Sequence, residues 1–383
     1  MRTATEPGLL PGPAARAGRR RVLVAPVTIT PTKPLSPSHL KGLFWTDVLV
    51  RASSVLADVT YRYSHTTYHP CEQTLGFWEY LDRVVGDTDY TACTEEEIGE
   101  HYVRFRAADD RPPFAACRPY LDAVERDGWT HPASARVLEL WSAHYAALGL
   151  HDPGLREHQP PGLTLDEAID QLSALGMCLD LRDVRGPVYL DATRDGQPLR
   201  LIVATDGRPN YLACALRELL ALAPAHDDVV LLYDRGLEPD YVLLHGVLSR
   251  LGTTVHRIPL GRVPIGGRIG SGRDGDWRGH HAGALLAGLA GHDDDALRLG
   301  LRLYFIAMLG PGDRTSYRPE LVERWVRRAA RMLAAGPGPV PPAEYLAGGF
   351  GDEPFVDPYR LASGLLTRHR ANPGPPLLRT VFT

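Results

Sequence analysis

One segment near the start of the chain constrains the fold more than any other feature: an apolar run, a proline-rich turn, a helical pattern and a second short strand. Residues 21–29 are rich in β-branched and apolar side chains, which is typical of a buried parallel strand. Residues 40–56 carry apolar side chains at helical spacing, and residues 59–63 form the second strand. Strand, helix and strand in this order make a βαβ unit, which predicts an α/β fold with a doubly wound parallel sheet.

The patterns that follow divide the rest of the chain. Residues 1–20 are rich in Ala, Gly, Pro and Arg and are interpreted as a disordered leader. Residues 21–292 then form the sheet domain, interrupted by a mostly helical insertion at about 77–162. Residues 293–383 add C-terminal helices and, after Pro337, a tail that we expect to be irregular. Further strands are expected at 187–191, 199–204, 228–233 and 253–258, and further helices at 165–175, 211–222, 241–251, 295–309 and 319–335.

The composition is ordinary and excludes several classes of protein. The formal net charge is −4, so no general basic surface is available for nucleic acid. No apolar run approaches the roughly 18 residues that a membrane span needs, and we expect a cytoplasmic protein without membrane contact. The 5 cysteines are scattered and form no CxxC pair, so neither a disulfide framework nor a four-cysteine zinc site is expected.

The turn between the first strand and the first helix is rich in polar groups that suit a binding site. It contains Ser36, Ser38 and His39, and the only two lysines of the chain, Lys33 and Lys41, lie on either side. A turn that leads into a helix exposes backbone N–H groups, and His39 and the lysines would add further donors and positive charge for an anion. The alternative interpretation is a simple helix start capped by Ser36 or Ser38.

Residues 30–42 resemble the HIGH region of class I aminoacyl-tRNA synthetases, especially the arginyl type. Thr-Asp-Gly-Arg-Pro-Asn-Tyr-Leu at 205–212 is similar to that family's Ser-Asp-Gly-x-x-Thr-Tyr segment. Residues 266–275, within the Gly/Arg loop 265–279, fall at the position of its KMSKS loop. The order and spacing of these segments agree across about residues 22–310. The resemblance implies a Rossmann-like catalytic domain. It also implies truncation, because the about 20 residues before the first strand and about 75 after Leu309 are too few for the family's RNA-binding and anticodon domains.

The chain departs from the family pattern at positions that matter for chemistry. Ser36 replaces the first histidine of HIGH, Ser38 replaces its glycine, and the 266–275 loop contains no lysine. The family's Gly-Ala-Asp-His-His-Gly segment, expected near 234–239, is missing. Ala215 stands where an acidic residue would hold a guanidinium, so arginine is not the expected substrate. The use of ATP with Mg therefore stays open, and no other cofactor is expected.

The resemblance also implies a set of site residues. The residues expected to surround a carboxylate or phosphate, and to stabilise the charge that develops on it, are His39, Lys33, Lys41, Arg268 and Arg273. The residues expected to bind the substrate are Ser36, Ser38, Tyr63, His65, Tyr68, His69, Gln73, Asp206, Asn210 and Tyr211.

Two polar clusters allow more than one interpretation. Residues 63–73 follow the second strand, at the edge of the sheet where ligands bind. His65, His69, Cys71 and Glu72 could instead hold a metal, but their spacing fits no familiar zinc pattern and no metal site is expected. Residues 276–281 are interpreted either as a mobile lid over the site or as a solvated loop.

Three functions fit these observations. The first is a synthetase-like ligase or aminoacyl transferase of specialised, natural-product metabolism, which joins an amino acid or aminoacyl group to a small amine or hydroxyl. The second is ATP-independent aminoacyl transfer or rearrangement in the same pocket. The third is a non-catalytic pseudo-synthetase that binds RNA or a partner protein. The expected ligand is an amino acid or aminoacyl substrate; the insertion could contact a tRNA acceptor stem, whereas anticodon recognition is not expected.

Overall fold

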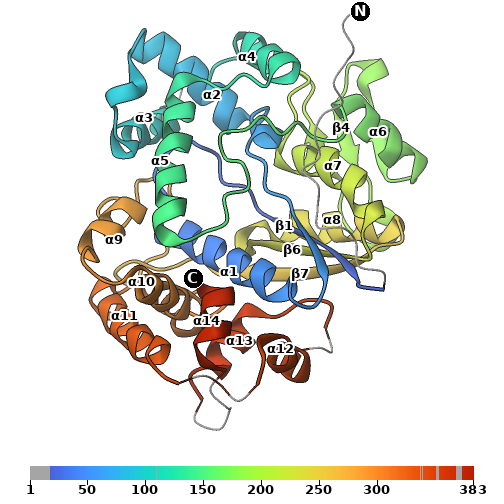
Figure 1. Ribbon diagram of the computed structural model, residues 1–383. Helices are drawn as coiled ribbons and strands as arrows, with labels where there is room; N and C mark the ends of the chain where they lie inside the picture. Colours follow the sequence, from blue (N-terminus) through green and yellow to red (C-terminus); the bar gives the residue numbers. More distant parts are fainter. Residues whose placement is uncertain (1–17, 109, 337, 339, 351–352, 368–372) are drawn as a thin grey trace, which may run out of the picture.

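A parallel sheet forms the centre of the molecule (Figure 1). The computed structural model describes residues 18–383 except 109, 337, 339, 351–352 and 368–372, so most of the expected leader lies outside the described residues. The four strands lie in the order β2-β1-β6-β7, and every neighbouring pair is parallel. Their bounds are β1 (Arg21–Pro26), β2 (Asp58–Tyr61), β6 (Asp228–Asp234) and β7 (Thr254–Leu260). The predicted doubly wound α/β sheet is therefore confirmed, with its topological switch point between β1 and β6.

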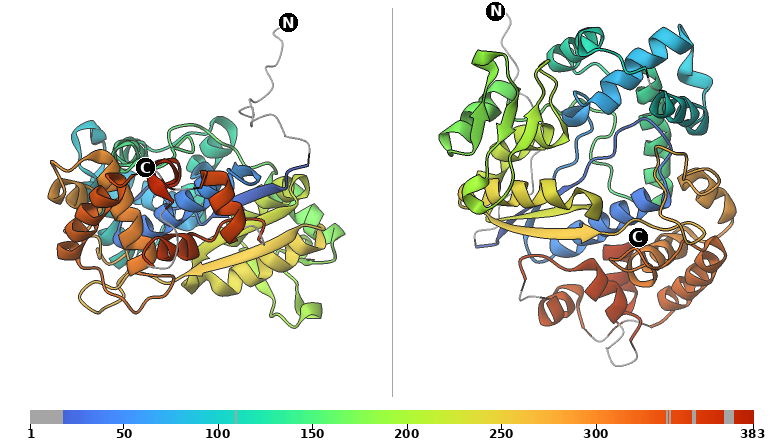
Figure 2. Two further views of the ribbon diagram at one scale, coloured as in Figure 1. Left: turned by 60° about the horizontal axis from the view of Figure 1, so that its bottom comes forward. Right: turned by 180° about the vertical axis from the view of Figure 1, so that it is seen from behind.

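Side chains of β1 alternate between two cores, as the period of a strand requires. Val22 and Val24 pack in the core that contains helix α1 (Pro37–Ser53). Leu23 and Ala25 point into the opposite core, which contains α7 (Tyr211–Leu222) and α8 (Glu238–Arg250). Helices cover both faces of the sheet (Figure 1 and Figure 2), and its two central strands, β1 and β6, are accordingly almost continuously apolar.

The expected insertion consists of helices on one side of the sheet, coloured light blue to green in Figure 1. Its helices are α2 (Glu72–Tyr80), α3 (Glu95–Ala107), α4 (Phe114–Asp127) and α5 (Pro132–Leu148). Thr94 and Glu97 start α3 with reciprocal hydrogen bonds: the Thr94 hydroxyl accepts the Glu97 N–H at 3.2 Å, and the Glu97 carboxylate accepts the Thr94 N–H at 2.8 Å.

A second sheet lies beside the first and is antiparallel. Its strands are β3 (Cys178–Asp180), β4 (Val188–Leu190) and β5 (Arg200–Val203), with helix α6 (Leu165–Ala174) before them. Strands β4 and β5 were expected, whereas β3 was not.

The C-terminal region corrects one expectation, because the tail after Pro337 is helical rather than irregular. It contains α12 (Pro342–Phe350), α13 (Pro358–Gly364) and α14 (Gly374–Phe382), which follow α9 (Ala282–Gly288), α10 (Asp294–Arg302) and α11 (Pro319–Leu333). Proline is tolerated in the first turn of a helix, so Pro342 and Pro358 begin helices that a count of prolines hides. Helix α14 packs on α1 and buries Phe382 completely. Among the described residues, no helix is long and apolar enough to cross a membrane.

Two buried cations hold α1 in place. The Lys41 ammonium donates to the carbonyl oxygens of Gly261 at 2.8 Å and Gly312 at 2.6 Å, and its residue is 1% exposed. Further along the helix, Arg302 of α10 donates to the Asp47 carboxylate at 2.6 Å and is fully buried. Lys41, one turn into α1, thereby fixes the start of the helix to the loop after β7, and Asp47, further along, fixes its middle to the C-terminal helices.

We expect Lys41→Met to destabilise the protein. The substitution removes two charge-assisted hydrogen bonds and leaves two carbonyls without a partner, which should lower the free energy of unfolding by about 2–4 kcal/mol. Urea unfolding followed by circular dichroism would measure the loss. Lys33→Met is the matched control, since Lys33 makes no hydrogen bond within the described chain; equal destabilisation by both variants would contradict a tether at Lys41 alone.

Candidate functional site

A cavity of about 640 Å³ opens at the carboxyl ends of the parallel strands. Its floor consists of the ends of β1, β6 and β7, at residues 26–28, 232–234 and 260–262. This is the switch point of the sheet, where the two crossover directions leave a crevice and ligands bind in open α/β folds. The start of α1, the insertion helix α3, the second sheet and the Gly/Arg loop close its sides.

Most of the site residues expected from the sequence line this cavity: Lys33, Ser36, Ser38, His39, Tyr63, Gln73, Asn210, Tyr211 and Arg273. They come from segments up to 240 residues apart, which the fold brings together around one space. Their placement makes a common binding site chemically sensible, while the role of each residue stays a prediction.

His39 is held as a neutral ring at the start of α1. Its Nδ1 accepts the backbone N–H of Ser36 at 3.2 Å, so the single ring proton resides on Nε2. Burial in the cavity wall, with the nearby charges of Lys33 and Arg262, lowers the pKa of His39 to about 3. At neutral pH this ring is therefore uncharged, with the carbonyl of Pro34 as an acceptor beside it.

Lys33 is the most unusual group of the site. It is 7% exposed, and within the described chain its ammonium makes neither a hydrogen bond nor an ion pair. The ammonium lies 4.9 Å from the ring centre of Tyr102, a cation–π contact from α3. Burial and the Arg273 charge lower the pKa of Lys33 to about 8, although Asp276 opposes them. A buried unpaired cation that lines a cavity is suited to an anionic ligand.

The Gly/Arg loop approaches Lys33 closely because two of its residues lack side chains. A Cβ at Gly272 would lie 2.6 Å from Cε of Lys33, and one at Gly270 would lie 2.7 Å from Cβ of Asp276. Burial raises the pKa of Asp276, whose Oδ1 is buried without a hydrogen-bond partner within the described chain. The loop thus covers this end of the cavity, and the interpretation of residues 276–281 as a mobile lid stays a prediction.

Polar groups at the opposite edge of the cavity are already paired. The Ser38 hydroxyl accepts the backbone N–H of Val263 at 2.9 Å. The Asp234 carboxylate accepts hydrogen bonds from Arg262 at 2.6 Å and from the Gly236 N–H at 2.8 Å. This edge includes residues 234–239, where the Gly-Ala-Asp-His-His-Gly segment implied by the resemblance is missing, and Ser38, Asp234 and Arg262 are paired within the protein.

A wall of tyrosines forms the third side. The Tyr211 hydroxyl donates to the carbonyl of Thr28, and the Tyr63 hydroxyl accepts the Ile29 N–H at 3.1 Å. Asn210 caps α7 through the Ala213 N–H at 2.9 Å. These bonds fix the wall from behind and leave the Tyr211 ring and the Gln73 amide as its lining surface.

Several expected site residues lie elsewhere. Lys41 belongs to the tether described above, and Tyr68 lies behind the wall, stacked on the Tyr211 ring at 4.2 Å. Arg268 forms an exposed two-residue bridge with Ile265. Asp206 does not line the cavity, but it forms an ion pair of 3.1 Å with Arg208, which does.

His65 and His69 also point away from the cavity, because the 3₁₀ turn at Thr66–Tyr68 redirects the chain after β2. His65 lines a second cavity of about 540 Å³ between the insertion and residues 156–158. His69 is fully buried against Trp78, with both ring nitrogens unpartnered within the described chain. Burial lowers the pKa of both rings, to about 4 for His65, so neither carries charge at neutral pH.

Other lining residues were missed by the sequence interpretation: Glu72, Tyr102, Arg106, Arg208, Asp234, Arg262 and Asp276. Arg106 is the most consequential, since its guanidinium has no ion pair within the described chain and adds positive charge beside Lys33. The spacing of Gly99, Tyr102 and Arg106 places them on one face of α3, and this spacing is the only feature of the sequence that could have indicated Arg106 as a site residue. That face could not be assigned to the cavity without knowing where the insertion packs.

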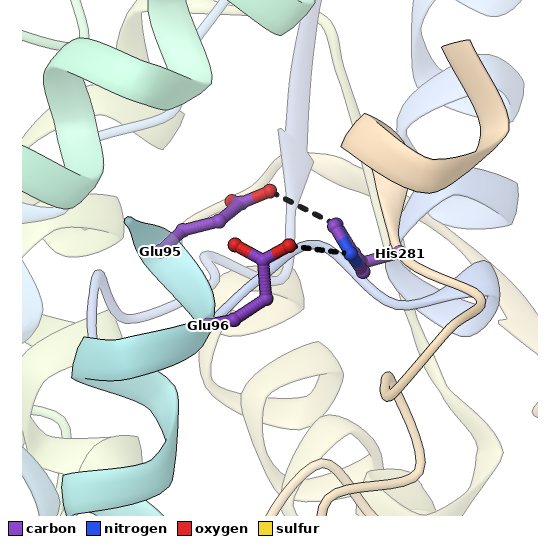
Figure 3. Close-up of side chains that lie close together, drawn as sticks. All are labelled: Glu95, Glu96 and His281. Carbon is purple, nitrogen blue, oxygen red and sulfur yellow. Dashed lines mark hydrogen bonds and ion pairs between the residues drawn. The ribbon is translucent and has the colours of Figure 1, made fainter. Parts of the chain in front are cut away.

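The described residues contain one group of histidine and carboxylates close enough to examine as a metal site: Glu95, Glu96 and His281 (Figure 3). It lies outside the cavity. His281 directs Nδ1 at Glu95 and Nε2 at Glu96, and these ring nitrogens point in different directions. One ion cannot replace both contacts, so the geometry is that of an ion-pair cluster.

Comparisons by sequence identify no relative: no protein-family model matches the chain, and no curated protein matches it. Comparisons of structure do. An arginyl-tRNA synthetase of Thermus thermophilus superimposes with a TM-score of 0.58 at 15% identity, over 94% of this chain and 74% of that one. A putative arginyl-tRNA synthetase of Campylobacter jejuni gives a TM-score of 0.47 at 14% identity, over 75% of this chain and 63% of that one. The first of these likenesses, together with the sheet order, shows that the chain has the fold of an arginyl-type class I aminoacyl-tRNA synthetase catalytic domain.

Proposed function

We propose that the chain is an enzyme of specialised metabolism that transfers an amino acid or aminoacyl group to a small amine or hydroxyl acceptor, as a ligase or transferase. One observation carries the proposal: the unpaired, buried Lys33 ammonium lies with Arg106 and Arg273 at one end of a cavity that His39 also lines. The three cations face one carboxylate of raised pKa, Asp276, which leaves this end positive. An activated aminoacyl group brings an anionic leaving group that such an end would receive.

The chemistry requires few participating residues. In the transfer, a bond forms between the acceptor nitrogen or oxygen and the carbonyl carbon, and the bond from that carbon to the leaving oxygen breaks. The proton released by the acceptor passes to the leaving oxygen. The Nε2–H of His39 and the Lys33 ammonium would stabilise negative charge on that oxygen.

The amino-acid side of the cavity supports an uncharged substrate side chain. Ala215 is buried on α7 and cannot pair with a cation. The nearest acid along that helix, Glu218, accepts hydrogen bonds from Arg62 and Thr67 and is 4% exposed. A guanidinium ligand would find no free carboxylate there, in agreement with the exclusion of arginine as the substrate.

A second route is favoured by the paired edge of the cavity. Ser38 uses the Val263 N–H and Arg262 uses the Asp234 carboxylate, so fewer groups remain to recognise a nucleotide base. This favours an aminoacyl group that arrives already activated, on the acceptor end of a tRNA, over activation by ATP with Mg. Transfer or rearrangement without ATP is therefore our second candidate function.

ATP–pyrophosphate exchange with a panel of amino acids separates the two routes. Exchange that requires one uncharged amino acid, and that falls at least tenfold in Lys33→Met, would support activation by ATP. Absence of exchange, with transfer from aminoacyl-tRNA to an amine, would support the second route. Neither activity, combined with salt-sensitive tRNA binding, would contradict an enzyme and indicate a pseudo-synthetase.

Anion binding should depend on the protonation of Lys33. The ammonium is charged below its pKa of about 8, so affinity for inorganic pyrophosphate should be greatest below that pH and fall as the pH rises through it. Calorimetric titration at pH 6.5 and 9.5 measures the change. Lys33→Arg should remove most of the dependence, because an arginine stays charged at both values.

Two arginines of the Gly/Arg loop provide a control for this titration. Arg273→Ala should weaken pyrophosphate binding, since Arg273 lines the cavity, whereas Arg268→Ala should leave it unchanged. Equal effects of the two substitutions would contradict the assigned anion site.

A further inference from the structure

One face of helix α3 runs beneath the Gly/Arg loop and into the cavity. Glu95, Gly99, Tyr102 and Arg106 follow one another at intervals of four, three and four residues, the spacing of a single helical face. Tyr102 lies under the Lys33 ammonium, and Arg106 lines the cavity one turn further. The beginning of this same face contacts the end of the loop.

Two contacts join the loop to α3 by packing and charge. The Trp277 ring is buried against Gly99, where a Cβ would come within 2.8 Å of it. Arg278 forms an ion pair with Glu100 at 2.8 Å in an exposed position, which contributes little to stability. Both contacts lie within four residues of His281, the residue that precedes α9.

His281 makes the third contact and is 7% exposed. Its Nδ1 forms a hydrogen bond of 3.1 Å with Glu95 Oε1, and its Nε2 lies at ion-pair distance, 2.8 Å, from Glu96 Oε1 (Figure 3). An imidazolium ring can pair with both carboxylates at once, whereas a neutral ring can donate a hydrogen bond from only one of its nitrogens. Glu95 Oε1 also meets His144 Nε2 of α5 at 2.9 Å, which connects a second insertion helix to the cluster.

We propose that His281, as an imidazolium held between Glu95 and Glu96, is a positioning residue that fastens the Gly/Arg loop to the insertion and so holds Arg273 and Asp276 over Lys33. The proposal concerns the loop and does not require the proposed reaction. Loss of one proton from the ring removes its positive charge, and with it the ion pairs to Glu95 and Glu96. The fastening is therefore strong in acid and weak in base.

The direction of the pH dependence follows from the groups that face the ring. Burial works to lower the pKa of His281, but the hydrogen bond to Glu95 and the charges of Glu96 and Glu95 outweigh it and raise the pKa. The charged and titratable groups around it are these two carboxylates of α3 and, through Glu95, His144 of α5. With a raised pKa in the fastened state, the contribution is complete below the ordinary histidine value of about 6.5 and is lost as pH rises through the raised value.

Hydrogen–deuterium exchange of the backbone of residues 266–280 tests the proposal, after correction for intrinsic exchange at each pH. In the unaltered protein we expect exchange to be slow at pH 6 and about tenfold faster at pH 9. His281→Gln should exchange fast at both values. His280→Gln is the matched control: this neighbouring ring packs edge-on against Tyr317 and should leave the pH dependence intact.

Glu96→Gln adds a variant at a half-exposed position, where loss of folding is not expected. It removes one charge from the cluster and should move the midpoint of the exchange transition to lower pH. A dependence that persists in His281→Gln, that disappears in His280→Gln, or that is absent from the unaltered protein would overturn the proposal. Loss of protection on adding EDTA would also overturn it, by indicating a metal-bound cluster instead.

Discussion

A buried ammonium group connects the two sides of the cavity. Lys41 lies one turn into α1, and its bonds to the carbonyls of Gly261 and Gly312 hold that helix to the loop after β7. Ser38 adds a second link one turn earlier, through the Val263 N–H. Residues 27–36 separate β1 from α1, and these bonds fix the start of that helix against the loop after β7. Both of these segments line the cavity, so its shape depends on Lys41, which does not line it.

The two lysines of the chain show how one residue type can serve opposite purposes eight positions apart. Lys41 is buried with two carbonyl acceptors. Lys33 is buried without an acceptor in the described chain and makes a cation–π contact with the Tyr102 ring. A buried cation without a partner costs free energy, and that cost is recovered when an anion binds. The sequence suggested one role for both, because their environments are created by residues about 70 to 270 positions away.

The parts of the fold that were predictable depend on local patterns. The first strand, loop and helix follow from the apolar periods, and α7 begins and ends where its pattern indicated, with Asn210 as its cap. The cavity end that contains Arg106 was not predictable, because its geometry arises where the insertion meets the Gly/Arg loop. The position of His65 was not predictable for a similar reason. A single 3₁₀ turn, too short to leave a periodic signal in the sequence, directs its side chain into the second cavity.

The departures from the family signature are consistent with one another once their contacts are considered. Ser38 replaces a glycine and uses the backbone donor of Val263; Arg262 in turn uses the carboxylate of Asp234. Both contacts use polar groups of the same cavity edge for hydrogen bonds within the protein. At the other end the opposite holds, because Lys33, Arg106 and Arg273 stay without anionic partners except Asp276. The anionic ligand that we propose would therefore direct its charge toward α3 and the Gly/Arg loop, and its recognition would rest more on that charge than on a nucleotide base.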